Sequence, residues 1–391
     1  MLKEFRGLVE GAVASRGVPG VPGVVGVLGV PGVPGVVGVL GRGDTTLATC
    51  VAGQADTLHP RPMTDDTVFD IASLTKVVAT TTATLALIGS GQLALGDPVA
   101  RYLPEVVWPA EVTIRHLLTH ASGLPGAVTF YEHCQTRAEL LGELFRTPLE
   151  APPGTRVVYS DLGFIALGEI VAAVCGEPLD VAVRRLIAGP LRLTATGYLP
   201  SGPPERFAAT EPRGDGTAWT GVVHDENARV MDGVAGHAGL FATAADLARF
   251  ARWWVGDDDG PVPVALRREA TTCQTEGLPG VEGYPGRRGL GWVCPGDRYD
   301  ILGGGWPPTA VSHTGFTGTS LALDHVTGTW LVLLTNAVHF GRDATAIKAL
   351  RRALHAAVAQ PSSHEQREQL PLRYGRLVTR TAGTNSCISE R

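Results

Sequence analysis

The chain has 391 residues and a formal net charge of −5. That length allows a large hydrophobic core and favours two lobes over one. Acidic and basic residues are mixed along the sequence, and no basic stripe interleaved with aromatic residues occurs, so we expect no nucleic-acid partner. The composition leaves the oligomeric state open.

The first residues, MLKEFRGLVEGAVASRG, lack the basic-then-apolar layout of a secretory signal peptide. Leu2, Phe5, Val9, Ala12 and Val13 recur at helical spacing, which predicts a surface helix with one buried stripe. No run of about 18 strongly apolar residues is free of charge, glycine and threonine, so we expect no membrane span. The six cysteines form no CxxC motif. We therefore predict a cytoplasmic protein with reduced thiols.

Residues 18–29 and 30–41 are the same twelve letters, VPGVPGVVGVLG. Valine-rich runs favour strands and Pro-Gly steps favour turns. The second copy leads into GRGDT and then TLATCVAG, which predicts a β-hairpin. The first copy is interpreted as a duplicated insertion, with a flexible elastin-like segment as the other interpretation.

Helical patterns dominate residues 61–287, for example a capping-box-like start at Thr243 with Asp246 three residues later. From about residue 288 the pattern changes to three strand-like runs, RRGLGWVC, AVSHTGFTGTSLAL and TWLVLLTNAV, followed by an amphipathic helix. We predict an α+β fold in which an antiparallel sheet combines both ends of the chain and helices flank it. The predicted units are a sheet lobe (1–60 with 288–360), an inserted helical lobe (61–287) and a loose tail (361–391).

The stretch FDIASLTKVVATTTATLALI, residues 69–88, predicts a helix that is apolar nearly all round and therefore buried. Lys76 lies on it, three residues after Ser73 and thus on the same helix face. The chain has only three lysines, Lys3, Lys76 and Lys348, among its 33 basic residues. A desolvated lysine can lose its proton, whereas an arginine cannot. The pattern therefore indicates a basic amine that activates the Ser73 hydroxyl, which is a poor nucleophile alone.

Two further segments strengthen this interpretation. PPGTRVVYSDLGF carries Tyr159 and Asp161, and SHTGFTGTS carries His313, Thr314 and Gly315. In this order, the three segments resemble the S-x-x-K, Y-x-N and K-T-G signatures of the serine β-lactamase and penicillin-binding protein superfamily. TIRHLLTHASGLP, GLGW and GVAGHAGLFATAADLARF resemble its class C-like branch, which includes peptidases, amidases and esterases. The resemblance covers roughly residues 36–358.

The resemblance implies a β-lactamase/transpeptidase-like fold and an acyl-transfer mechanism without a cofactor. Ser73 would attack a carbonyl, Lys76 and Tyr159 would move the proton, and the backbone N–H groups of Ser73 and Phe316 would form the oxyanion hole. Asp161, His313, Thr314 and Gly315 would contact the substrate.

The chain departs from the family pattern at two positions. Asp161 stands where the family has asparagine; paired with Lys76, it would keep the amine charged and favour Tyr159 as the base. The alternative is that Asp161 points away and caps a helix. His313 stands where the family has the K-T-G lysine, and a neutral histidine would hold a substrate carboxylate more weakly. Other members of the branch that this chain resembles carry H-T-G at the same position.

Other histidines have open or structural interpretations. His237, in the glycine-rich GVAGHAGLF loop, either contacts substrate or fills a turn. His224 and Asp225 in VHDENA are expected to make structural pairs rather than to catalyse. His116 and His120 have the i, i+4 spacing of a helical metal site but lack a third ligand, so we predict no metal there.

The sequence therefore predicts a serine hydrolase that cleaves an amide or ester through an acyl-serine, on cell-wall-derived peptides, muropeptides or small esters. A D-Ala-D-Ala carboxypeptidase or a weak β-lactamase is the first alternative. A non-catalytic sensor that keeps a penicillin-binding-like fold is the second, and Asp161 and His313 are the residues that allow it. The partner in each case is a small molecule or peptide.

Overall fold

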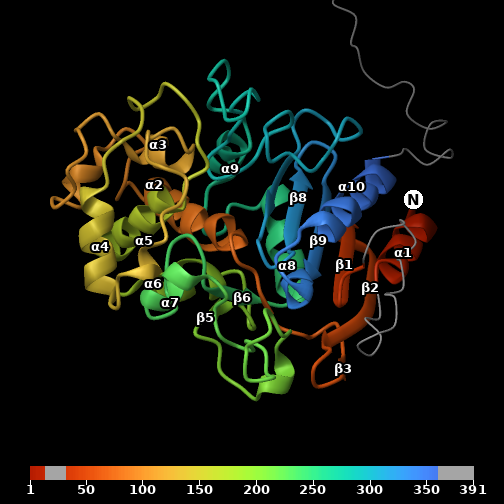
Figure 1. Cartoon of the computed structure of the whole chain (residues 1–391). Helices are drawn as coiled ribbons and strands as arrows, with labels where there is room; N and C mark the ends of the chain where they lie inside the picture. The colour runs from red at the N-terminus through yellow and green to blue at the C-terminus, as the bar shows by residue number, and fades with distance from the viewer. Residues whose placement is uncertain (14–31, 360–391) are drawn as a thin grey trace, which may run out of the picture.

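A six-stranded antiparallel sheet forms one side of the molecule, and both ends of the chain supply its strands (Figure 1). The computed structural model describes residues 1–13 and 32–359, so the first repeat copy and the predicted tail lie outside the described residues. The strand order is β3-β2-β1-β9-β8-β7. The bounds are β1 Gly35–Arg42, β2 Thr45–Asp56, β3 Arg61–Pro62, β7 Val311–Thr314, β8 Ser320–Asp324 and β9 Thr329–Thr335. The predicted α+β class is confirmed.

Strand β1 lies between β2 and β9 and is buried on both faces. Val36 and Leu40 pack with Phe5 in one hydrophobic cluster, whereas Val37 and Val39 belong to the cluster on the opposite face. Successive side chains of a strand point to opposite faces, so an uninterrupted apolar run suits a strand that helices cover on both sides. The hairpin predicted from the second repeat copy is confirmed as β1 and β2.

Helices cover both faces of the sheet. Helices α1 (Leu2–Gly11) and α10 (Thr345–Ala359) contact each other on one face, and α8 (Ala244–Val255) packs against β1, β8 and β9 on the other (Figure 1). Helix α8 starts where the capping pattern predicts, because the Thr243 side chain accepts a hydrogen bond from the Asp246 backbone N–H. Since α8 comes from the middle of the sequence, part of the predicted helical lobe packs directly on the sheet. The lobe boundaries stay a prediction.

The remaining elements lie mainly beside the sheet, with α2 to α6 grouped together (Figure 1). The helical turns and helices are η1 Lys76–Thr81, α2 Thr82–Gly89, η2 Val99–Arg101, α3 Ile114–Leu118, η3 Phe130–Glu132, α4 Arg137–Arg146, α5 Asp161–Cys175, α6 Leu179–Val183, η4 Arg184–Ala188, η5 Pro204–Arg206, α7 Glu226–Val230, α9 Val264–Ala270 and η6 Ala337–Phe340. A small second sheet has the order β4-β6-β5, with β4 Phe69–Asp70, β5 Gly197–Tyr198 and β6 Leu240–Ala242. Within the described ranges, no single helix is long and apolar enough to span a membrane, although the bent pair Asp161–Cys175 and Leu179–Ala188 passes that test jointly.

The helix predicted over residues 69–88 begins later than expected. Phe69–Asp70 forms β4, and a turn follows in which the Asp70 carboxylate accepts the Ala72 backbone N–H at 2.8 Å. Ala72 has a φ of 46°, a left-handed conformation that a non-glycine residue adopts only under external constraint. The turn delivers Ser73 to the start of the helical segment, whose first part, Lys76–Thr81, is a π-helix.

The strand predicted for RRGLGWVC is wrong. Gly291, at a φ of 79°, turns the chain back, and only isolated bridges form, between Arg288 and Val293 and between Val293 and Ser312. The strands predicted in AVSHTGFTGTSLAL and TWLVLLTNAV and the helix after them are confirmed as β7, β8, β9 and α10.

The close approach of β1 to β9 yields a first prediction, that Gly41→Ala destabilises the fold. A Cβ at Gly41 would lie 2.0 Å from Cζ2 of Trp330, which is fully buried and whose indole N–H donates to the Gly43 carbonyl. Overpacking of this kind lowers the free energy of unfolding by about 1–3 kcal/mol. Urea unfolding of Gly41→Ala measures the change.

Gly7→Ala is the matched control, because a Cβ at Gly7 meets no atom within 4 Å and the residue lies in α1. Because alanine has a higher helix propensity than glycine, Gly7→Ala should leave the free energy of unfolding unchanged or raise it by up to about 1 kcal/mol. Equal stability of Gly41→Ala and the unmodified protein would contradict the packing described for β1 and β9.

Candidate active site

Ser73 and Lys76 meet as the sequence predicts. Ser73 lies in the turn after β4, Lys76 is the first residue of η1, and the Lys76 ammonium donates to Ser73 Oγ at 3.0 Å. The Lys76 side chain is 0% exposed. A buried ammonium needs acceptors for its protons, so its surroundings decide what the serine can do.

The Lys76 ammonium has two further acceptors. It donates to the His237 main-chain carbonyl at 3.1 Å and forms an ion pair with Asp161, whose Oδ1 lies 2.6 Å from Nζ. Burial alone would lower the pKa of Lys76, but the Asp161 carboxylate and Tyr159 outweigh it, so the pKa is raised above its ordinary value. Lys76 is therefore charged in the resting site, as the pairing with Asp161 predicts. Asp161 points toward Lys76 and is the first residue of α5, while Ser160 is the capping residue.

Tyr159 completes the cluster from the loop before α5. Its side chain hydrogen-bonds with both Ser73 and Lys76, and Nζ of Lys76 lies 5.0 Å from its ring centroid. Burial raises the pKa of Tyr159, and the opposing effect of Lys76 does not cancel it. The phenol is therefore protonated at rest, so it is not already ionised for the role of base that the sequence favours.

Strand β7 brings the H-T-G residues to the same site. His313 is buried, its Nδ1 lies 3.0 Å from the Thr314 carbonyl, and its ring centroid lies 6.0 Å from that of Tyr159. Burial lowers the pKa of His313 well below its ordinary value, with Lys76 and Arg288 adding to the effect. The imidazole is therefore neutral, as predicted. A neutral imidazole that donates through Nδ1 carries no proton on Nε2. His313 therefore offers a substrate neither a positive charge nor an Nε2–H donor.

The turn after β7 is tied to the serine turn. A Cβ at Gly315 would lie 2.4 Å from the Ile71 carbonyl oxygen, which also accepts the Thr319 hydroxyl at 3.0 Å. Only glycine permits this approach, so Gly315 sets the distance between the H-T-G strand and the nucleophile.

The predicted oxyanion hole has free donors. Among the described residues, the backbone N–H groups of Ser73 and Phe316 donate to no protein acceptor. The Phe316 side chain is 56% exposed, and its ring stacks on His224 with centroids 5.6 Å apart. The residue that would bind the oxyanion thus has its ring at the surface and a buried histidine behind it.

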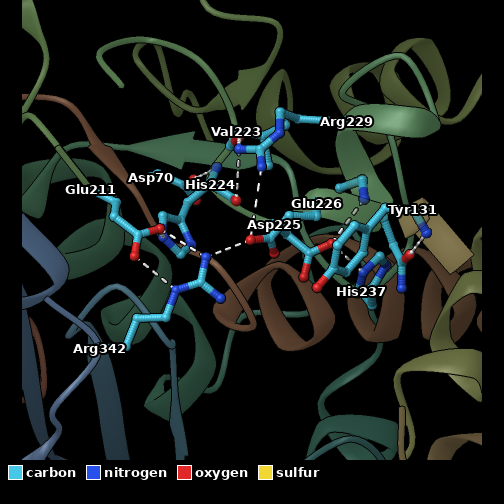
Figure 2. Close-up of polar contacts among 12 residues, drawn as sticks. Asp70, Tyr131, Glu211, Val223, His224, Asp225, Glu226, Arg229, His237 and Arg342 are labelled. Carbon is cyan, nitrogen blue, oxygen red and sulfur yellow. Dashed lines mark hydrogen bonds and ion pairs between the residues drawn. The ribbon is translucent and has the colours of Figure 1, made fainter. Parts of the chain in front are cut away.

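The VHDENA segment supports the site, as Figure 2 shows. The His224 backbone N–H donates to the Asp70 carboxylate at 2.6 Å, and Asp225 Oδ1 lies 2.9 Å from His237 Nε2. The His237 side chain therefore pairs with Asp225, while its carbonyl receives Lys76. This favours the structural interpretation of His237 and confirms the expected pairing of His224 and Asp225.

Arg342 lies beside Phe316 and takes part in the same polar network. Arg342 donates to both carboxylate oxygens of Glu211 at 2.8 Å and to Glu226 at 2.5 Å (Figure 2). Its guanidinium lies 5.9 Å from the Phe316 ring centroid. Its charge is therefore neutralised in place. These three residues were not identified from sequence, because nothing in their local patterns links such distant positions.

A second arginine was also missed. Buried Arg288 binds Asp297 through two hydrogen bonds of 3.1 and 2.9 Å, and its guanidinium lies 5.5 Å from the Tyr159 ring and 5.2 Å from that of Tyr299. The RRGLGW segment was noted as strand only. An Arg-Arg pair gives no sign that one guanidinium is buried beside the active site.

The two histidines with the i, i+4 spacing of a helical metal site make separate contacts. His116 Nδ1 lies 3.0 Å from the Glu111 carbonyl, whereas His120 follows the helix at a φ of 57° and its Nδ1 accepts the Ser160 N–H at 3.0 Å. Elsewhere in the described residues, donor atoms of His133, Cys134 and Glu143 lie within 4.8 Å of one another, a group that could hold a cation. The five cysteines that the structure describes are free thiols, and Cys387 lies outside it.

The fold and the Ser73, Lys76 and Tyr159 cluster define a hydrolase of the class C-like β-lactamase and penicillin-binding protein type. The Beta-lactamase family profile matches residues 5–356, so the chain belongs to that family. It is 34% identical to a provisionally named D-alanyl-D-alanine carboxypeptidase of Escherichia coli (strain K12) over 72% of this chain and 71% of the relative. It is 33% identical to an N-acetylmuramyl-L-alanine amidase of Bacillus subtilis (strain 168) over 72% and 70%.

Solved structures confirm the β-lactamase/transpeptidase-like fold. A beta-lactamase/D-alanine carboxypeptidase from Yersinia pestis superposes with a TM-score of 0.67 at 21% identity, covering 84% of this chain and 93% of the other. EstCE1, a hydrolase with acyltransferase activity, superposes with a TM-score of 0.64 at 22% identity, covering 83% and 94%.

The Asp225–His237 pair yields a second prediction. Asp225→Ala removes the acceptor that holds His237, and the carbonyl that receives Lys76 then loses its support. Misplacement of a catalytic group by about 1 Å can cost on the order of 100-fold in rate, so we expect kcat on an ester to fall 10- to 100-fold (about 1.4–2.7 kcal/mol) with KM little changed.

Asp225→Asn, which keeps an acceptor oxygen, should retain more activity than Asp225→Ala. Asp257→Ala is the control, because the Asp257 side chain is 98% exposed. If Asp225→Ala keeps full kcat while remaining folded, the pair does not position Lys76.

Proposed function

We propose that the protein is a serine hydrolase that cleaves an amide or ester through an acyl-Ser73 intermediate. The observation that carries the proposal is the contact of Ser73 Oγ with the Lys76 ammonium at 3.0 Å, with Tyr159 hydrogen-bonded to both, in a member of a hydrolase family. Lys76 and Tyr159, which come from different segments, converge on the Ser73 hydroxyl, as nucleophilic catalysis requires.

The arrangement supports each step of acyl transfer. Ser73 Oγ attacks the carbonyl carbon, and the N–H groups of Ser73 and Phe316 bind the oxygen as it becomes negative. The serine proton passes into the hydrogen-bonded cluster around Lys76, and the Tyr159 hydroxyl, protonated at rest, protonates the leaving group. Water then releases the acyl group by the same steps in reverse.

The charges of the site favour a substrate without a carboxylate next to the scissile bond. His313 is neutral, Lys76 is paired with Asp161, and Arg288 is paired with Asp297. On the Phe316 side, Arg342 is bound by Glu211 and Glu226. Lys76, Arg288 and Arg342 are thus already paired with carboxylates, and the buried Arg351 guanidinium donates to the carbonyls of Gly315 and Thr319. An incoming carboxylate would therefore lose its hydration without gaining a cation that is free of other partners.

Within the proposal, the substrate is a neutral amide or ester, including the amide linkages of cell-wall-derived peptides and muropeptides. The relative from Bacillus subtilis named as an amidase supports this class. The Escherichia coli relative supports a D-Ala-D-Ala carboxypeptidase as the second candidate, which the site's charges disfavour. A cytoplasmic location is part of the same proposal.

A third prediction tests the nucleophile. We expect Ser73→Ala to lower the hydrolysis of p-nitrophenyl butyrate by about 1,000-fold or more, since removing a nucleophile typically costs this much. A fluorophosphonate probe should add its mass to Ser73 of the unmodified protein. Ser90→Ala, at the exposed serine that follows α2, is the control. Equal rates for the Ser73→Ala and unmodified proteins would favour the non-catalytic sensor.

A fourth prediction tests the role of His313. In His313→Lys, the amine restores the cation of the K-T-G pattern, and a charge-assisted hydrogen bond is about twice as strong as a neutral one. We expect KM for an N-acyl-D-Ala-D-Ala peptide to fall about 5- to 10-fold, with little change for its methyl ester. His313→Gln is the neutral control. If the unmodified protein already prefers the free acid to the ester, the proposed neutral substrate is wrong.

A further inference from the structure

The resting protonation of the active site does not by itself identify the group that accepts the Ser73 proton. Lys76 keeps its charge at rest; its ammonium donates to Ser73 Oγ and to the His237 carbonyl and forms an ion pair with Asp161. A lysine that already carries three protons has no lone pair with which to accept a fourth. Lys76 alone therefore cannot take the proton that Ser73 releases.

Tyr159 is not a free acceptor for this proton either, because burial raises its pKa and keeps the phenol protonated. Its oxygen can receive the Ser73 proton only as it releases its own. The nearest group with room for a proton is the Asp161 carboxylate, with Oδ1 2.6 Å from Lys76 Nζ. Its side chain is 24% exposed, so it also lies within reach of water.

We propose that Asp161, behind Lys76, is the acceptor of the proton that Ser73 releases, and that Lys76 relays this proton. The inference rests on the proposed acyl-Ser73 function and assigns the base within it. It replaces the sequence-based preference for Tyr159 as the base. The distances that carry it are 3.0 Å from Ser73 Oγ to Nζ and 2.6 Å from Nζ to Asp161 Oδ1.

In the acylation step, Ser73 Oγ bonds to the carbonyl carbon, and the carbonyl π electrons move to the carbonyl oxygen. The Oγ proton moves to Lys76 Nζ while one Nζ proton moves to Asp161 Oδ1. When the intermediate collapses, the carbon–leaving-group bond breaks, and a proton returns from Asp161 through Lys76 and Tyr159 to the leaving group.

Other titratable groups around the pair are fixed in charge. His120 and His313 both have pKa values well below the ordinary one because they are buried, so they are neutral. Asp225 has its pKa held low by His237, which outweighs its burial. Arg288, paired with Asp297, lowers the pKa of both histidines, and Arg351 also lowers the pKa of His313. His120, His313 and Asp225 therefore keep one charge state while the proton moves among Ser73, Lys76 and Asp161.

The test is the pH dependence of acylation, measured as the second-order rate of fluorophosphonate labelling and as kcat/KM for p-nitrophenyl butyrate. For the unmodified protein we expect a flat profile above about pH 6, with an acid limb where carboxyl groups titrate. In Asp161→Asn, acylation must wait for Lys76 to lose a proton. The rate should then rise tenfold per pH unit through neutrality, so that the variant loses at least 10-fold at pH 6 and recovers by pH 9.

The sign of this shift follows from the causes of the Lys76 pKa. Asp161 raises that pKa and burial lowers it, so removing the carboxylate brings Lys76 deprotonation down into the measurable range. Asp161→Glu, which keeps a carboxylate, should keep the acid limb of the unmodified protein and remains informative if Asp161→Asn does not fold. Asp257→Asn, at a fully exposed aspartate, is the matched control.

The outcomes separate this inference from the proposed function. Absence of Ser73 labelling in folded, unmodified protein overturns the acyl-serine function itself. Labelling with the same pH profile in Asp161→Asn and the unmodified protein leaves that function intact and overturns the role of Asp161. An alkaline-shifted limb in Asp161→Asn, with the acid limb retained in Asp161→Glu, supports it.

Discussion

The buried ammonium of Lys76 is the constraint around which the site is organised. A side chain with no exposed surface keeps its charge because the Asp161 carboxylate and Tyr159 outweigh its burial. Three oxygens placed around the ammonium are the hydroxyl of Ser73, the carbonyl of His237 and the carboxylate of Asp161. These oxygens come from the turn after β4, the loop before β6 and the start of α5. Breaking any one contact would leave a buried proton donor unpaired, so the charge requirement of a single amine fixes how three segments meet.

The supporting contacts follow from that requirement. Asp70 accepts from the backbone of Ala72 and of His224, and thereby holds the strained turn in front of Ser73 against the loop that carries VHDENA. The neighbouring Asp225 holds His237 and so the carbonyl beneath Lys76. One dipeptide thus supports both sides of the nucleophile. This gives Asp70, Asp225 and His237 a structural role beside the site that needs no contact with substrate.

Periodicity predicted the sheet, its flanking helices and the meeting of Ser73 with Lys76, because strands, caps and short helical spacings are encoded locally. That Tyr159 joins them was predicted from the family resemblance. The turn at Ala72 was missed because the residues that enforce it, such as Thr317 and Thr319, lie about 250 positions away. Arg288 and Arg342 were missed for the same reason, since their partners come from other segments. The protonation of Tyr159 depends on burial, which a sequence does not reveal.

The two departures from the family pattern act in the same direction. Replacing the asparagine of Y-x-N by Asp161 adds a negative charge, and replacing the lysine of K-T-G by a neutral His313 removes a positive one. The cleft is therefore more negative by two charges than the pattern it resembles. A single such change could be accommodated by local repacking, but two that shift the electrostatic potential alike alter what the cleft attracts. The carboxylate that gives the site its proton acceptor also repels the carboxylate of an anionic substrate, so the choice of base and the choice of substrate are coupled.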